Sequence, residues 1–123
     1  MEFIHGLVNL YRQRKECAAT IGNFDGVHLG HQLVLEQLKE TAKRFNLIST
    51  VLIFEPQPME YFSPEASPSR LTRLREKLQQ FSNCNIDRVV CLKFNQELAN
   101  LSAPDFIDNI LLKGLSAKKI IVG

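Results

Sequence analysis

The segment CAATIGNFDGVHLGHQLVLEQL, residues 17–38, decides the fold of this chain of 123 residues. It opens with an apolar run from Cys17 to Ile21, passes through a glycine-rich turn, and enters an amphipathic stretch after Gly30. A short continuous apolar run is typical of a strand that is buried on both faces of a parallel sheet. The segment therefore predicts a strand, a tight turn and a helix in direct succession.

Three further apolar runs, at residues 48–54, 89–94 and 120–122, predict the other strands. Amphipathic stretches separate the four runs, so strands and helices alternate along the chain. Such alternation is typical of an α/β fold in which helices cover both faces of a parallel sheet through right-handed crossovers. A chain of this length fits one domain, so residues 1–123 are expected to form a single domain.

Apolar residues recur with helical spacing in three places. Ser102 is expected to cap the start of the third helix, Pro104 suits its first turn, and Gly114 is expected to end it. The apolar positions are Val34, Leu38, Ala42 and Phe45 in the first helix, Leu71, Leu74, Leu78 and Phe81 in the second, and Phe106, Ile107, Ile110 and Leu111 in the third.

The stretch at residues 55–69 contains four prolines and is expected to be an irregular loop. It follows the second predicted strand, and open α/β sheets bind their ligands at the carboxyl ends of the strands. Two interpretations remain open for it: a loop that touches substrate, or an ordinary excursion on the surface.

Composition excludes several classes of protein. Hydrophobic residues make up 45% of the chain and charged residues 23%, which is ordinary for a globular domain and too apolar for disorder. A net charge of +2 is too small to indicate binding to nucleic acid or to a membrane surface. No run approaches the length of a membrane-spanning helix. Three cysteines without paired spacing predict reduced thiols and a cytoplasmic protein, with Cys17 and Cys91 buried.

The turn from Gly22 to His31 has the composition of a phosphate site. Gly22 and Gly26 are expected to allow backbone geometry that a β-carbon would forbid, and to let the backbone approach a ligand closely. The start of the following helix presents unpaired N–H groups and the positive end of the helix dipole, which attract anions. His28 and His31 are three residues apart, so both imidazoles can face one phosphate and donate hydrogen bonds to it. This pattern favours transfer of a nucleotidyl group, in which positioned donors stabilise the charge that builds on the phosphate oxygens.

Each residue of the turn also has a simpler interpretation. The two histidines could be half of a metal site, but no third and fourth ligand has matching spacing, so no metal ligands are predicted. Asp25 could brace the turn through its carboxylate. Phe24 is expected to anchor the core rather than to stack on a base. The combination of strand, turn, histidines and helix start is more specific than any of its parts.

The sequence resembles a known family at several points. The segment GNFDGVHLGH, residues 22–31, resembles the nucleotide-binding signature of the adenylyltransferase module in bacterial bifunctional riboflavin kinase/FAD synthetase. Further similar stretches follow in the same order and cover the chain from about residue 16 to its last residue. They are FEPQP at 54–58, RLT at 70–72, EK at 76–77, LKF at 92–94 and IIVG at 120–123.

The resemblance implies a Rossmann-like nucleotidyltransferase fold that makes FAD and pyrophosphate from FMN and ATP, with Mg²⁺. It implies that His28 and His31 are catalytic groups on the ATP phosphates. Pro56 and Pro58 would shape the wall on the flavin side, although proline there also simply ends a strand. The residues implied in binding ATP are Gly22, Asn23, Phe24, Asp25 and Gly30.

Two departures from the family pattern qualify this expectation. Gln57 stands between the two prolines where the family commonly has histidine, which removes a titrating group. The chain ends at Gly123, before the segments that complete the ATP site and before the riboflavin kinase domain that the family carries in cis. We therefore expect a partial domain, incomplete at its C-terminus, with little turnover on its own. The alternatives are a nucleotidyltransferase with another phosphorylated acceptor, or a non-catalytic nucleotide-binding module.

Overall fold

A computed structural model describes residues 1–25, 29–63 and 73–122 of the chain. Helices and strands alternate along it, as the sequence predicts, with additional short elements. The elements are β1 (Glu2–His5), α1 (Leu7–Tyr11), β2 (Cys17–Ile21), α2 (Leu29–Arg44), β3 (Ile48–Phe54), α3 (Pro58–Phe62), α4 (Leu74–Asn83), β4 (Arg88–Leu92), α5 (Gln96–Ala99), α6 (Ala103–Phe106), the π-helix η1 (Ile107–Gly114) and β5 (Ala117–Ile121).

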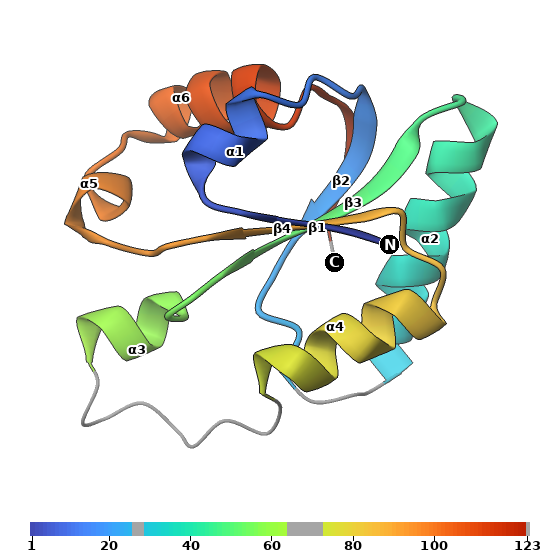
Figure 1. Cartoon of the computed structure of the whole chain (residues 1–123), viewed down its shortest axis with the longest axis horizontal. Coiled ribbons are helices and arrows are strands. Elements are labelled where there is room, and N and C mark those ends of the chain that lie inside the picture. The colour runs from blue at the N-terminus through green and yellow to red at the C-terminus, as the bar shows by residue number, and fades with distance from the viewer. Residues whose placement is uncertain (26–28, 64–72, 123) are drawn as a thin grey trace.

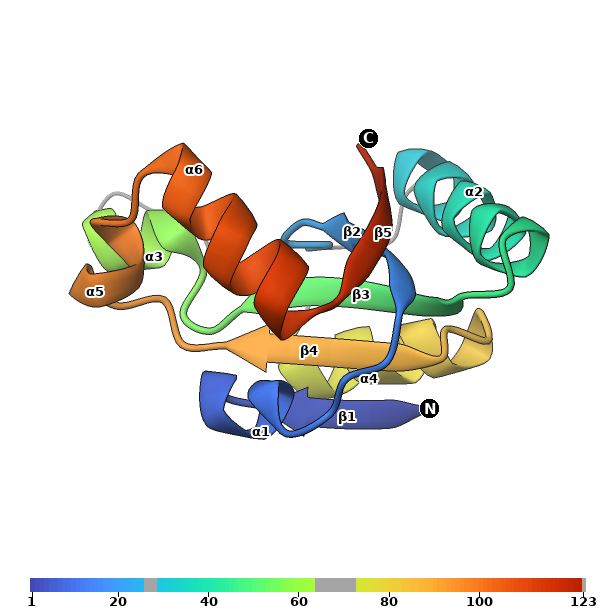
Figure 2. The ribbon, with the colours of Figure 1, turned by 90° about the horizontal axis from the view of Figure 1, so that it is seen from above.

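The strands form one parallel sheet in the order β1-β4-β3-β2-β5, which confirms the α/β class (Figure 2). The runs predicted at residues 17–21 and 48–54 are strands with those bounds. The third begins one residue earlier than predicted and ends at Leu92. The last begins at Ala117 rather than at residue 120, because Lys118 and Lys119 interrupt the apolar run at an exposed edge of the sheet. Strand β1 was not predicted, since it buries only Ile4.

Helices cover both faces of the sheet (Figure 1). Helices α1 and α6 lie on one face and α2 and α4 on the other. Side chains alternate between these two layers along each inner strand. Leu52, for example, packs in the layer that contains Leu10 and Ile110, whereas Val51 packs in the layer that contains Leu38. The inner strands β3 and β4 are buried over nearly their whole length, as expected for a sheet covered on both sides.

The predicted helices are present, with three differences. Phe45 is not a core residue: α2 ends at Arg44 because Asn46 adopts a left-handed φ of 55°, and the Phe45 ring is 46% exposed. The third helix changes to a π-helix after Phe106, and Ile107 is exposed rather than buried. Leu71 lies outside the described residues. The cap is confirmed, because Ser102 Oγ accepts a hydrogen bond of 3.2 Å from the amide of Asp105.

The stretch at residues 55–69 is not irregular throughout, since α3 begins at Pro58. Proline lacks a backbone N–H, which the first turn of a helix does not need, so it can begin a helix as well as end a strand.

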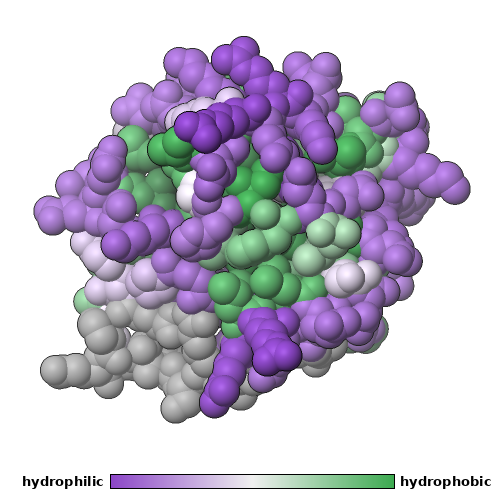
Figure 3. All heavy atoms as spheres, in the orientation of Figure 1, coloured by the Kyte–Doolittle hydropathy of each residue, from purple (hydrophilic) through white to green (hydrophobic). Residues whose placement is uncertain are grey.

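Apolar side chains of β1, the outermost strand on one side of the sheet, reach the surface. In the orientation of Figure 1, Figure 3 shows hydrophobic residues gathered in the middle of the molecule. Among the apolar residues of β1 and its start, the side chains of Met1 and Phe3 are 49% and 41% exposed.

Strands β2 and β5 form the switch point of the sheet. After β2 the chain crosses one face of the sheet as α2 and continues into β3, which pairs with one side of β2. Later it crosses the opposite face as η1 and continues into β5, which pairs with the other side of β2. In open α/β sheets a crevice forms at such a point, outside the carboxyl ends of the strands, and ligands bind there. The fold thus directs attention to the residues that follow Ile21.

Candidate functional site

A cavity of about 350 Å³ lies at the carboxyl end of β2. It is bounded by the last residues of the strand, the turn that follows and the first turns of α2. The described residues that line it are Thr20, Ile21, Gly22, Asn23, Phe24, Gly30, His31 and Val34. The cavity therefore coincides with the predicted phosphate site.

The floor of this cavity is fixed from both sides. The amide of Gly22 donates a hydrogen bond of 3.2 Å to the carbonyl oxygen of Leu52 in β3. The hydroxyl of Thr20, which is 1% exposed, donates a hydrogen bond of 2.9 Å to the carbonyl oxygen of Ile121 in β5. The end of β2 is thus held between its two neighbours, and the turn leaves the sheet from a fixed position.

Phe24 anchors the turn in the core, as the sequence predicts. Its side chain is only 7% exposed, and its ring meets the ring of Phe81 edge-on with a centroid distance of 5.4 Å. The residue adopts a φ of 52°, a conformation rare for a bulky side chain and kept only where the surroundings impose it. The left-handed residue described in this turn is Phe24, whereas no such φ occurs at Gly22.

Gly22 is required for a reason that differs from the prediction. A Cβ atom on Gly22 would lie 2.9 Å from Cε2 of Phe24, closer than atoms in contact approach. The glycine therefore makes space for the aromatic anchor beneath the cavity, and not for an unusual backbone angle.

The first turn of α2 forms the opposite wall. Gly30 is exposed there, and His31 is half-buried with its ring 5.0 Å from the ring of Phe24. No acidic residue occupies the first turn of this helix of 16 residues, and the positive end of a helix dipole favours an anion. Amide N–H groups, an imidazole and a glycine surface on one wall form an environment for an anion.

The predicted site residues do not all meet in this cavity. Asp25 is half-buried in the turn but does not line it, and neither do Pro56 and Pro58. His28 and Gly26 lie outside the described residues.

Pro56 and Pro58 lie at the carboxyl end of the neighbouring strand β3. The Glu55–Pro56 peptide bond is cis, and Pro58 begins α3. Gln57 between them is 8% exposed, and its carbonyl oxygen accepts a hydrogen bond of 3.1 Å from the amide of Tyr61. The prolines thus share the edge of the sheet with the cavity without bordering it.

An aromatic cluster beside these prolines was missed by the sequence analysis. The ring of Phe94 lies 5.5 Å from that of Tyr61, 5.6 Å from that of Phe62 and 5.6 Å from that of Phe54. The signal for it was weak, because the aromatic pair at residues 61–62 falls in the stretch interpreted as a loop. Pro58 was the local signal for the short helix, because proline suits the first position of a helix.

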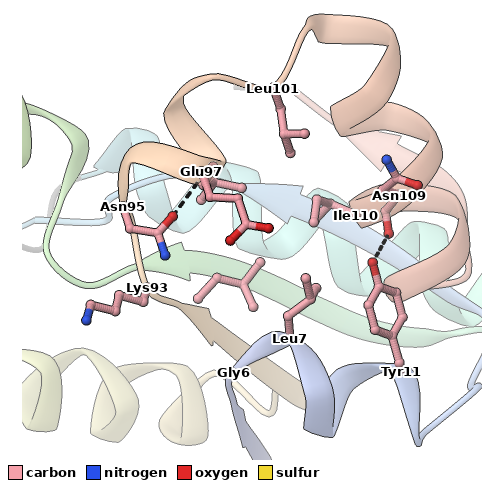
Figure 4. A pocket seen from close by; sticks show the side chains of 11 residues that line it. Gly6, Leu7, Tyr11, Lys93, Asn95, Glu97, Leu101, Asn109 and Ile110 are labelled. Atoms are coloured by element: carbon pink, nitrogen blue, oxygen red, sulfur yellow. Dashed lines mark hydrogen bonds between the residues drawn. The ribbon is translucent and has the colours of Figure 1, made fainter.

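A second cavity, of about 330 Å³, opens on the other face of the sheet near the carboxyl ends of β1 and β4 (Figure 4). Its lining combines aliphatic residues, such as Leu7, Leu101 and Ile110, with polar ones, such as Asn95 and Glu97. Tyr11 closes one end, where its hydroxyl donates a hydrogen bond of 3.1 Å to the carbonyl oxygen of Asn109. This cavity depends on β1 and α1, which the sequence did not reveal.

The described residues contain no group of three or more His, Cys, Asp or Glu side chains arranged to hold a metal ion. None of the helices in the described part of the chain is long and apolar enough to span a membrane.

Comparison with known proteins identifies the family. The model of the FAD synthetase family matches residues 10–123. A bifunctional riboflavin kinase/FMN adenylyltransferase from Pseudomonas fluorescens is 48% identical over 123 residues, which is all of this chain and 39% of that protein. The protein of the same name from Escherichia coli K12 is 46% identical over 124 residues, all of this chain and 40% of that protein.

A crystal structure described as a macrolide-efflux protein from Streptococcus pneumoniae matches 98% of this chain and 47% of its own, with a TM-score of 0.83 and 20% identity. At that identity the match supports the fold alone. The curated relatives are longer than this chain, which spans about 40% of their length. The family match covers almost all of the chain and includes the turn at the end of β2. The chain belongs to the FAD synthetase family.

Proposed function

We propose that this chain provides the ATP phosphate-binding part of an FMN adenylyltransferase, which forms FAD and pyrophosphate from FMN and ATP. The observation that carries the proposal is the cavity between the turn after β2 and the start of α2, which combines His31, Gly30 and the first turn of this helix. The family match supports the same reaction, because two relatives at 46–48% identity are named for it.

The reaction is a single displacement at phosphorus. A phosphate oxygen of FMN attacks the α-phosphorus of ATP, the bond to the bridging oxygen of the β-phosphate breaks, and pyrophosphate leaves with that oxygen and its electron pair. Negative charge builds on the oxygens of the α-phosphate and of the leaving group. Donors already aimed at these positions lower the barrier without a covalent intermediate.

In this proposal His31 donates an imidazole N–H to a phosphate oxygen, and its ring is oriented by contact with Phe24. The first amides of α2 supply further donors, and the missing side chain of Gly30 lets a phosphate approach them. Asn23, in the turn, lines the same cavity. His28 remains the second proposed phosphate donor on the grounds of the sequence pattern.

The acceptor is proposed to bind on the β3 side of the same edge. Pro56 and Pro58 shape the end of β3, and the rings of Tyr61, Phe62 and Phe94 offer an apolar surface beside them. A flavin ring is large, flat and largely apolar, so it suits such an aromatic surface. Gln57 is expected to serve through hydrogen bonds and not through acid–base chemistry.

Mg²⁺ is part of the proposal as the counter-ion of the ATP phosphates. Magnesium is usually held by one or two carboxylates together with substrate phosphates, so a dedicated cage of protein ligands is not needed. We also infer a riboflavin kinase domain in cis, as the names of the relatives suggest, and a cytoplasmic location, from three cysteines without paired spacing.

A hybrid protein tests the proposal. This chain replaces the matching 124 residues of the E. coli relative, to which it is 46% identical. We expect the hybrid to form FAD from FMN and ATP. A hybrid that folds and binds ATP but adenylylates another phosphate ester would favour the alternative of a nucleotidyltransferase with another phosphorylated acceptor. ATP binding with no transfer to any acceptor would favour a non-catalytic nucleotide-binding module.

A further inference from the structure

Three rings connect helix α4 to the proposed phosphate site. Phe81, on α4, is 2% exposed and meets the ring of Phe24 edge-on at 5.4 Å. The ring of Phe24 in turn lies 5.0 Å from that of His31, tilted by 48°. Phe81 itself does not line the proposed ATP cavity, so any effect on the site passes through Phe24.

Phe24 has little freedom to move towards the sheet. On that side the α-carbon of Gly22 is so close that even one added methyl group would lie 2.9 Å from the ring. The φ of 52° is also unfavourable for phenylalanine and must be maintained by its contacts. The position of the ring is thus set by Gly22 on one side and by Phe81 on another.

Space exists on a further side. A cavity of about 110 Å³ lies between α2 and α4, and Phe24, Phe81 and His31 all line it. Its other lining residues are Gln32, Leu35, Gln80, Asn83 and Cys84. If the ring of Phe81 were shortened, the rings of Phe24 and His31 could turn towards this space. Through its contact with Phe24, Phe81 therefore limits how far the His31 ring can turn away from the ATP cavity and into this space.

We propose that Phe81 is a positioning residue for nucleotide binding, which fixes the imidazole of His31 through the ring of Phe24. This inference rests on the proposed function, because it gives the His31 ring a phosphate to meet. It assigns α4, which lies apart from the turn in sequence, a part in the geometry of the ATP site.

The test compares three variants. Phe81→Leu keeps an apolar side chain but removes the ring, Phe81→Tyr keeps the ring, and Ile86→Val is a matched control. Ile86 is 2% exposed and belongs to the same layer of the core, but it has no ring with which to contact Phe24. The 123-residue chain, labelled in its histidines, reports the imidazole resonances of His31 by NMR, which ring currents of Phe24 displace. The hybrid enzyme reports kcat and the KM for ATP.

We expect Phe81→Leu to move the His31 resonances towards their positions in a free histidine and to lower kcat/KM for ATP by about 10- to 100-fold. The KM for FMN should stay constant. Phe81→Tyr and Ile86→Val should keep both the resonances and the rate close to the parent values.

The inference is overturned if Phe81→Leu leaves the His31 resonances in place, or if Ile86→Val lowers kcat/KM as much as Phe81→Leu does. The NMR result stands even where the hybrid fails to fold. Failure of the proposed function would look different: His31→Ala itself would then leave adenylylation normal, whatever the Phe81 variants do.

Discussion

Two ends of the sheet differ: the amino edge, where the parallel strands begin, and the carboxyl edge, where they end. At the amino edge buried polar side chains form hydrogen bonds within the protein, whereas at the carboxyl edge polar side chains line a cavity. Arg88 is fully buried at the start of β4, where its Nε donates a hydrogen bond of 3.0 Å to Oγ1 of Thr50. Its Nη2 donates another of 3.0 Å to the carbonyl oxygen of Leu115. The same carbonyl oxygen accepts a hydrogen bond of 3.3 Å from the thiol of Cys17.

The carboxyl edge is arranged differently. Hydrogen bonds of Gly22 and Thr20 hold the end of β2 between its neighbours, the ring of Phe24 packs between Gly22 and Phe81, and Asn23 and His31 line the cavity. The amides at the start of α2 and the imidazole of His31 lie where a ligand can reach them. The buried polar side chains of the amino edge thus serve stability, whereas Asn23 and His31 at the carboxyl edge line a cavity that a ligand can enter.

The comparison predicts that changes at the two edges separate activity from stability. His31→Ala should produce the largest effect on activity. In the hybrid enzyme we expect adenylylation to fall by about 10²- to 10³-fold, as for loss of one donor to a developing negative charge. The free energy of unfolding should fall by less than the barrier to transfer rises, since the ring contact with Phe24 is worth about 1 kcal/mol. The rate of FAD formation measures the activity, and equilibrium unfolding in urea measures the stability. Normal turnover in a folded His31→Ala variant would contradict the phosphate site.

Arg88→Ala should have the reverse effect. It leaves Oγ1 of Thr50 without its Arg88 donor and the carbonyl oxygen of Leu115 with the Cys17 thiol as its remaining donor. An unsatisfied buried group costs about 1–3 kcal/mol, and the substitution also opens a cavity. We expect the free energy of unfolding to fall by about 3 kcal/mol or more, with the ATP affinity of the folded chain unchanged. Lys118→Ala is the control at the same edge. Lys118 forms an exposed ion pair of 4.0 Å with Glu16, so its loss should change stability by less than about 1 kcal/mol. Equal losses in the two variants would contradict the assignment of stability to buried hydrogen bonds.

Sequence patterns predicted some helices and strands of the fold and missed others. The strand, the turn and the start of the helix at residues 17–38 follow from local pattern, because apolar runs and helical period depend on neighbours in the chain. The short strand β1 and helix α3 could not be predicted in this way. Only Ile4 of β1 is buried, and Pro58 was interpreted as a strand end.

The reasons for individual residues were harder to predict than their positions. The contact of Phe24 with Phe81 brings together segments far apart in the chain, and the need for glycine at position 22 follows from that contact. The buried Arg88 also escaped prediction, since a charged residue at a strand boundary ordinarily indicates solvent. Tertiary contacts decide all three, and a single sequence does not encode them locally.

Gly22→Ala should disturb the carboxyl edge by an intermediate amount. The added methyl group meets the Phe24 ring at 2.9 Å, and overpacking of this kind costs about 1–3 kcal/mol. We expect this loss in urea unfolding, together with weaker ATP binding. The double variant Gly22→Ala/Phe24→Leu is the matched test, because a smaller side chain at position 24 relieves the contact. The two changes should therefore be less than additive, whereas strict additivity would show that the ring is not what Gly22 accommodates.

The smallest effect should come from Cys17 at the amino edge. Burial raises the pKa of the Cys17 thiol above its ordinary value of 9.0, although hydrogen bonding to Thr50 and the nearby charge of Arg88 partly oppose this. The folded chain therefore retains the proton at a pH where the unfolded chain releases it. The contribution to stability is constant below about pH 8 and declines as the pH rises above 9, by up to about 1.4 kcal/mol at pH 10. Urea unfolding of the parent chain and of Cys17→Ala at pH 8 and pH 10 isolates this contribution, since other groups titrate in both. If the parent lost no more stability than the variant between these two pH values, the thiol would not lie in a dry, hydrogen-bonded site. The contrast between the two edges would then depend on Arg88 alone.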